Sequence, residues 1–158
     1  MSNRTDEFAE ILACVLNYVA EHPDCAVIIG GDFNCEFTAS ERTLWPLLCE
    51  FMSECDLTYT DHLITDDKCY IYYQPTTGAT SHIDHFIVSR SLLECVESVS
   101  VIDDGCNLSD HLPVTIVCNQ SKYVTKVITE CSMQFLLVRI QHKLSSVTLG
   151  QSRPNFLL

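Results

Sequence analysis

Two segments in the first third of the chain carry apolar side chains at the spacing of an amphipathic helix. Residues 6–21 and 40–54 place them every three or four positions, as a helix with one buried face requires. The apolar positions are Phe8, Ile11, Leu12, Val15, Leu16 and Val19 in the first segment and Leu44, Leu47, Leu48, Phe51 and Met52 in the second. Between the two helices, the short apolar run at 25–30 predicts a buried strand, and Gly30 and Gly31 end it.

From residue 57 onward the pattern changes to that of strands. Short apolar or alternating segments, separated by turn-forming residues such as those at 74–78, are typical of strands. The predicted strands cover residues 57–59, 69–73, 83–89, 96–102 and 113–118. Helices and strands therefore alternate first and strands follow, which predicts an α/β fold with a sheet covered by helices.

The segment after residue 118 has a different pattern. Its apolar positions between Tyr123 and Leu144 are compatible with one amphipathic helix. We therefore expect a domain at residues 1–118 and a divergent tail at residues 119–158.

The ten cysteines are scattered along the chain, with no C-x-x-C pair and no zinc-ribbon spacing. Most lie in apolar runs, where free cysteine packs as a small hydrophobic residue. The first residues are polar and lack the apolar segment of a secretory signal, and no run reaches the roughly 18 apolar residues of a membrane span. These features predict an intracellular protein, nuclear or cytoplasmic and not secreted, with reduced thiols.

The net charge of −12 is unevenly distributed. Residues 1–114 carry 20 acidic side chains and 4 Lys or Arg, whereas residues 115–158 carry 1 acidic side chain and 5 Lys or Arg. A protein that holds nucleic acid by neutralising phosphates presents basic faces, which the first 114 residues lack. DNA binding by this chain therefore depends on positive charge from metal ions or from further sequence.

Three clusters of carboxylate, amide and imidazole groups lie at the ends of predicted strands. They are Gly31-Asp32-Phe33-Asn34, Ser81-His82-Ile83-Asp84-His85 and Ser109-Asp110-His111-Leu112-Pro113. Cleaving a phosphodiester needs a carboxylate that binds a divalent cation, a carboxylate that orients water, and neutral groups that bind phosphate oxygens. The imidazole also needs a carboxylate partner to fix its tautomer. Each cluster alone also fits a turn or a polar strand edge, but the three together favour a phosphodiesterase site.

The three clusters resemble the last three motifs of the endonuclease/exonuclease/phosphatase superfamily, which has the DNase I-like fold. The matching segments are Ile29–Asn34, Ser81–Ser89 and Ser109–Val114, within a resemblance that spans roughly residues 8–118. The segment Tyr70–Ser89 is most similar to the endonucleases of LINE-type retrotransposons, which belong to the superfamily with the apurinic/apyrimidinic endonucleases. The resemblance implies a partial DNase I-like sandwich, about one sheet with covering helices, in which this chain forms the C-terminal half.

The resemblance also implies a role for five residues. Asp32 would align or deprotonate the attacking water, and Asn34 would hold the scissile phosphate or an oxygen at the metal. Asp84 would orient His111, and His111 would donate a hydrogen bond to the pentacovalent phosphorane. Asp110 would be a metal ligand for Mg²⁺ or Mn²⁺, together with Asp32 and Asn34.

Two further imidazoles lie beside the matched Asp84. His82 and His85 flank Asp84 without matching a catalytic position, and we expect His85 to be structural.

The first half of the family's domain normally supplies an Asn, a Glu metal ligand in a Gln-Glu-like motif and usually a Tyr or His. Nothing upstream of Asp32 matches them, because Glu7, Glu10 and Glu21 fit the solvated face of the first helix. We therefore expect weak metal binding, an exposed apolar sheet face, and contact with a missing N-terminal half or another protein.

The predicted function is divalent-metal-dependent hydrolysis of phosphodiester bonds, with DNA as substrate and no membrane partner. An inositol-phosphate or phospholipid phosphatase of the same fold is the first alternative, because the acidic surface suits a small anionic substrate held by a metal. A catalytically inactive remnant that acts as an interaction module is the second, supported by the absent Glu motif. The resemblance favours an enzyme, and activity of this chain alone stays open.

Overall fold

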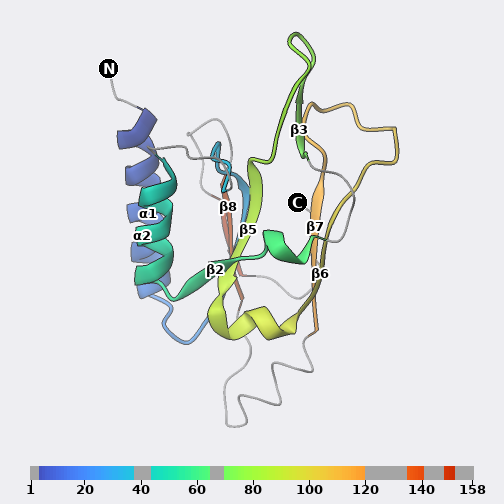
Figure 1. Cartoon of the computed structure of the whole chain (residues 1–158). Coiled ribbons are helices and arrows are strands. Elements are labelled where there is room, and N and C mark those ends of the chain that lie inside the picture. Colours follow the sequence, from blue (N-terminus) through green and yellow to red (C-terminus); the bar gives the residue numbers. More distant parts are fainter. Residues whose placement is uncertain (1–3, 38–43, 65–69, 120–134, 141–147, 152–158) are drawn as a thin grey trace.

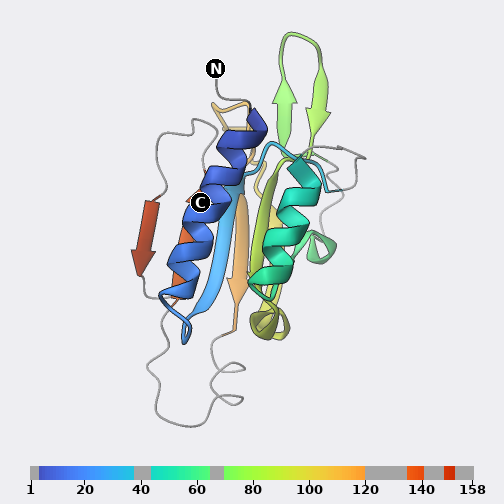
Figure 2. The same cartoon turned by 90° about the vertical axis from the view of Figure 1, so that its left-hand side faces the viewer.

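The fold consists of three layers in the computed structural model, which describes residues 4–37, 44–64, 70–119, 135–140 and 148–151. Two helices cover one face of a five-stranded sheet, and a two-stranded sheet packs on the other face (Figures 1 and 2). The main elements are α1 (Arg4–Ala20), β1 (Ala26–Asp32), α2 (Leu44–Glu54), β2 (Leu57–Tyr59), β3 (Tyr72–Gln74), β4 (Ala79–Ser81), β5 (Asp84–Ser89), β6 (Val96–Val101), β7 (Val114–Cys118), β8 (Phe135–Ile140) and β9 (Thr148–Gln151). The predicted α/β partial sandwich, one sheet with covering helices, is confirmed.

The five-stranded sheet has the order β2-β5-β1-β8-β9, with β1 at its centre. Strand β1 pairs antiparallel with β5 on one side and parallel with β8 on the other. Two short 3₁₀ helices, η1 (Asp61–Leu63) and η2 (Arg90–Cys95), follow β2 and β5. Because β1 has a strand on each side, its backbone N–H and C=O groups are satisfied without water.

Strand β1 also separates two hydrophobic cores, because successive side chains of a strand point to opposite faces. Val27 and Ile29 pack with Leu12 of α1 and Leu48 of α2 in the first core. Ala26 and Ile28 pack with residues of β5, β6 and β7, among them Phe86, Val88, Val99, Val114 and Ile116, in the second core. Residues 26–29 and 86–88 are all buried, so the expectation of an exposed apolar sheet face is wrong for these two strands. The β6–β7 sheet covers the face in question.

The polar segment between β2 and β5 contains the β3–β4 hairpin, whose turn includes Gly78. Gly78 has a φ of 71°, a conformation that glycine adopts without a Cβ penalty. Strand β3 overlaps the strand expected at 69–73, and the turn was expected at 74–78, but β4 was missed because Ala79–Ser81 is short and exposed and carries no apolar alternation.

The expected helix at 123–144 is wrong over the part that the structure describes. Residues Phe135–Ile140 form strand β8, which pairs parallel with β1, and β9 pairs antiparallel with β8. An apolar run this short fits a buried strand as well as a helix, and the free edge of β1 offers it a ladder of hydrogen bonds. The remaining residues of the expected helix lie outside the described residues.

No helix among the described residues has both the length and the apolar character that crossing a membrane demands.

Replacing Ile29 with alanine is predicted to lower the free energy of unfolding by about 2–4 kcal/mol. The side chain is fully buried at the centre of the sheet, so truncation leaves a cavity between β1 and the helices. Urea denaturation measures the change. The matched control is Val117→Ala on β7, where the side chain is 48% exposed and the expected loss is below about 1 kcal/mol. Equal losses in the two variants would contradict the assignment of the core.

Cys118 at the end of β7 is predicted to resist alkylation. Burial, and to a lesser degree Cys95 and Glu97, raise the pKa of its thiol from 9.0 to about 11. Only the thiolate reacts, so at pH 8 the reactive fraction falls about 100-fold below that of an ordinary thiol. Mass spectrometry after brief iodoacetamide treatment should show Cys106, a free and exposed thiol, modified first. Cys118 should become reactive only as the pH approaches 11, and rapid labelling at pH 8 would contradict this account.

Candidate functional site

The pairing of β1 with β5 brings the first two polar clusters together. The strands are antiparallel, so the last residue of β1 lies opposite the first residue of β5, and Asp32 is the register partner of Asp84. Side chains of residues directly opposite in an antiparallel pair lie on the same face, with Cβ atoms about 4.5–5.5 Å apart. Two carboxylates from separate motifs therefore lie side by side.

A tight turn after β1 holds the Asp32 carboxylate in place. The backbone N–H of Asn34 donates to Asp32 Oδ1 at 2.8 Å, and Asn34 Nδ2 donates to Asp32 Oδ2 at 3.1 Å. Asn34 has a φ of 52°, a conformation that asparagine tolerates better than most residues. Arg4 of α1 donates to the backbone oxygen of Asn34 at 3.0 Å. The segment Gly31–Asn34 thus forms a turn, which was the alternative interpretation of this cluster. The same turn holds both carboxylate oxygens of Asp32, a residue that is only 8% exposed.

The third cluster reaches the same place through His111. The Nδ1 atom of His111 lies 2.7 Å from Oδ2 of Asp84, with the two side chains 25% and 19% exposed. A carboxylate is an acceptor, so this contact makes Nδ1 the donor and leaves Nε2 as the nitrogen that can meet a ligand. Asp84 and His111 are thus in contact, and the role of Asp84 in orienting the catalytic ring stays a prediction.

The loop that carries His111 is bonded to the β3 region on both sides of the imidazole. Tyr73 N donates to the Asp110 carbonyl at 2.9 Å, and Leu112 N donates to the Ile71 carbonyl at 2.7 Å. The backbone N–H of His111 donates to Ser109 Oγ at 3.1 Å. These bonds fix the position of the ring relative to β5.

The charge distribution at this site suits a cation with oxygen ligands. Burial raises the pKa of Asp84 above its ordinary value and the neighbouring Asp32 carboxylate adds to this, while the hydrogen bond from His111 acts in the opposite direction. Two adjacent, largely buried carboxylates repel each other, and a divalent cation beside them would offset that repulsion. Carboxylate and amide oxygens are the ligands that Mg²⁺ and Mn²⁺ prefer, so the donor set fits the expected ion.

Among the described residues, no contact joins the carboxylate of Asp110 to Asp32 or Asp84. The Asp110 side chain is exposed, and Oδ1 accepts a hydrogen bond of 3.5 Å from Ser109. It lines a surface depression of about 350 Å³ together with Tyr73 and Asn107, and this lining includes neither Asp32 nor Asp84. Contacts therefore link Asn34, Asp32, Asp84 and His111 in sequence, whereas the role of Asp110 as a metal ligand stays a prediction.

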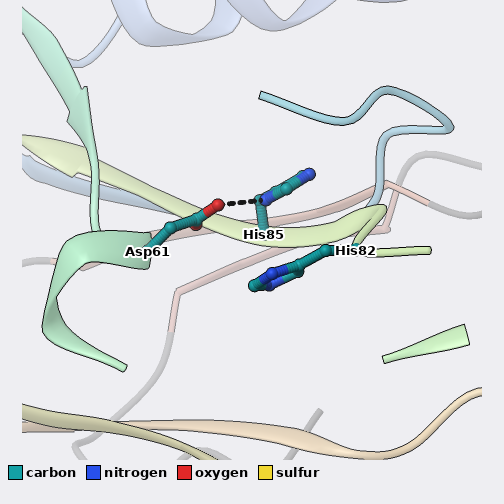
Figure 3. Close-up of side chains that lie close together, drawn as sticks. All are labelled: Asp61, His82 and His85. Atoms are coloured by element: carbon teal, nitrogen blue, oxygen red, sulfur yellow. Dashed lines mark hydrogen bonds and ion pairs between the residues drawn. The ribbon is translucent and has the colours of Figure 1, made fainter. Parts of the chain in front are cut away.

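A second group of potential ligands lies close to this site, and its member Asp61 was missed from the sequence. Among the described residues, Asp61, His82 and His85 place their ligand atoms within 4.8 Å of one another (Figure 3). Burial lowers the pKa of His82, and the neutral ring that this favours is the form that binds metals. No motif points to Asp61, because the pairing of β2 with β5 is what brings it to His85.

Comparison with solved structures gives an endonuclease/exonuclease/phosphatase family protein from Bacteroides thetaiotaomicron, at 22% sequence identity and a TM-score of 0.49. The alignment covers 69% of this chain and 43% of that one, so the chain spans less than half the length of the matched protein. No protein-family model matches the chain, and no curated protein matches it.

Replacing Asp84 with alanine is predicted to change the tautomer of His111. In the parent chain, the contact with Asp84 keeps hydrogen on Nδ1. Without the carboxylate, hydrogen should move to Nε2, and the ¹⁵N chemical shifts of the ring report which nitrogen carries it. An unchanged ring spectrum at pH 9 would show that Asp84 does not orient His111. His22, whose Nδ1 contacts the Tyr18 carbonyl, is the internal control and should keep its shifts.

Proposed function

We propose that this chain carries the C-terminal half of a DNase I-like, divalent-metal-dependent phosphodiesterase, closest to LINE-type retrotransposon endonucleases, with DNA as its substrate. The observation that carries the proposal is the 2.7 Å contact between His111 Nδ1 and Asp84 Oδ2, with Asp32 in register beside Asp84. An imidazole fixed by one carboxylate, with a second carboxylate beside the first, is an arrangement that can support in-line attack of water on a phosphodiester.

In this proposal Asp32 orients the attacking water and accepts its proton. The carboxylate is largely buried and bonded to Asn34 through both oxygens, so it is held rigidly at the end of β1. Rigid positioning keeps the water in line with the bond that breaks. The Asn34 amide, fixed by the same turn, binds a phosphate oxygen without adding negative charge.

His111 acts on the other side of the phosphate. Asp84 accepts from Nδ1, and a ring that carries hydrogen on both nitrogens would also donate from Nε2 to a non-bridging oxygen as charge develops on the pentacovalent phosphorus. Asp84 serves as a positioning residue, because it acts through His111 and not on the phosphate itself.

Asp110, Asp32 and Asn34 would hold Mg²⁺ or Mn²⁺ in this proposal. When bound, the ion would neutralise charge on the phosphate and lower the pKa of a water molecule that it binds. It also supplies the positive charge that residues 1–114 lack, with their 20 acidic and 4 basic side chains. The same imbalance favours the second candidate, a phosphatase of the same fold acting on inositol phosphates or phospholipids, because a small anionic substrate needs no extended basic face.

Nicking of supercoiled plasmid in the presence of Mg²⁺ tests the proposal. The parent chain should convert supercoiled to open-circular DNA, EDTA should stop the reaction, and His111→Ala should slow it by about 100- to 1,000-fold. The matched control is His62→Ala, which removes an exposed imidazole and should leave the rate within about twofold. Circular dichroism verifies that both variants fold.

The outcomes separate the candidate functions. Nicking that survives His111→Ala would contradict the assigned role of this residue. If the chain does not nick DNA but releases phosphate from inositol phosphates in a Mg²⁺-dependent reaction, the substrate is the smaller molecule and not DNA. Neither activity in a folded chain would contradict catalysis and favour the inactive remnant.

A further inference from the structure

The two nitrogens of the buried His85 ring face two hydrogen-bond acceptors. Nε2 lies 2.7 Å from the backbone carbonyl oxygen of Cys35, and Nδ1 lies 2.8 Å from Oδ2 of Asp61. The residue is 2% exposed and stacks on Phe37 with ring centroids 3.6 Å apart. A carbonyl can only accept, so Nε2 carries hydrogen. With hydrogen on Nε2 alone, Nδ1 directs a lone pair at a carboxylate oxygen, and this contact is favourable only with a proton or a metal ion between the two atoms.

The ring of His82 completes the group from the short connection between β4 and β5. Its Nε2 atom is buried and has no hydrogen-bond partner among the described residues. The ring lies nearly parallel to that of His85, with centroids 5.2 Å apart and an angle of 15° (Figure 3). The backbone N–H of His82 donates to Glu36 at 3.2 Å. A buried polar atom without a partner is costly, and a ligand close to His85 would satisfy it.

This group lies on the face of the sheet opposite the proposed catalytic pair. Asp84 and His85 are consecutive in β5, so their side chains point to opposite faces. Phe33 and Phe37, which contact His85, belong to or pack on the core under the helices. The group is therefore a separate site from that of Asp84 and His111.

We propose that Asp61, His82 and His85 form a binding site for a divalent transition metal, of which Zn²⁺ is the best fit. Two imidazole nitrogens and one carboxylate oxygen are a ligand set that Zn²⁺, Co²⁺ or Ni²⁺ accepts and that Mg²⁺ and Ca²⁺ do not favour. The hydrogen bond from His85 Nε2 to the Cys35 carbonyl is the outer contact that metal-bound histidines usually make. Three protein ligands leave a fourth position for water.

Metal binding requires a small shift of the Asp61 side chain. Ligands of a tetrahedral zinc lie about 3.3 Å apart, given metal–ligand bonds of about 2.0–2.1 Å. The 2.8 Å between Asp61 Oδ2 and His85 Nδ1 must widen by about 0.5 Å, and the ligand nitrogen of His82, now within 4.8 Å of the others, must move inward. Asp61 starts a short 3₁₀ helix and its side chain is 18% exposed, so its carboxylate has room to rotate.

The occupied site would join three segments that are distant in sequence. Asp61 follows β2, His85 belongs to β5, and Cys35 follows β1 in the turn next to Asn34. The metal would thus stabilise the ends of the two strands that carry Asp32 and Asp84. Its removal would lower stability without removing any group of the proposed catalytic set.

Titration of the full-length chain with Zn²⁺ and Co²⁺ in the presence of excess Mg²⁺ tests the proposal. We expect one Zn²⁺ per chain, a rise in Tm of about 5 °C at saturation, and a visible Co²⁺ spectrum of a tetrahedral site. His82→Ala should weaken the affinity by at least about 100-fold, whereas His62→Ala, next to Asp61 and exposed, should change it less than about threefold. His82 is not fully buried and neither nitrogen of its ring is bonded to Asp61 or His85, so this variant should fold.

The Co²⁺ spectrum also separates this site from metal bound by cysteine. The chain has ten cysteines, and thiolate ligands would add an intense ultraviolet charge-transfer band that nitrogen and oxygen ligands lack. Binding with that band, binding unchanged in His82→Ala, or no Zn²⁺ binding at micromolar concentration would each overturn the proposal. In the last case a proton on His85, and not a metal, bridges the ring to Asp61. None of these readouts depends on nicking, so the two proposals fail independently.

Discussion

The antiparallel pairing of β1 with β5 is the constraint on which both sites depend. The register sets Asp32 opposite Asp84, and the same pairing places Gly31 opposite His85 on the next rung. Slipping the register by one residue would move every side chain of a strand to the opposite face, separating the carboxylates and forcing Ile28 or Ile29 from its own core into the other. The two cores on either side of β1 therefore enforce the geometry of the polar residues at its end.

The acidic groups at the end of this sheet lie close together with little exposure, an arrangement that bound cations would stabilise. Asp32 and Asp84 lie side by side with little exposure, and Asp61 lies behind them next to His85. The described part of the chain brings few basic side chains here: Arg4 reaches the turn through the backbone oxygen of Asn34, and the remaining partners are imidazoles. A hard cation on the carboxylate side and a transition metal on the imidazole side would each compensate charge that the chain itself leaves uncompensated. This need for cations is the common basis of the two proposals.

The sequence predicted where the helices and strands lie along the chain better than it predicted which strands pair and which residues meet. Apolar spacing located α1, α2, β1, β5, β6 and β7 to within a few residues, because each buries a continuous face. The motifs identified Asp32, Asn34, Asp84 and His111, which contacts in the structure link. Asp61 could not be predicted, because its partner His85 is specified by strand pairing and not by spacing along the chain. Strand β8 was taken for a helix for a similar reason: a short apolar run becomes a strand when an unpaired sheet edge is present.

A crystal structure of the chain with Mn²⁺ and a short DNA duplex, with the metal located by its anomalous scattering, would test the proposed catalytic site. We expect a Mn²⁺ peak within about 2.5 Å of an Asp32 oxygen, with Asp110 drawn into the coordination sphere and a phosphate oxygen at His111 Nε2. A structure in which Mn²⁺ binds only elsewhere, or in which the phosphate avoids His111, would contradict that proposal.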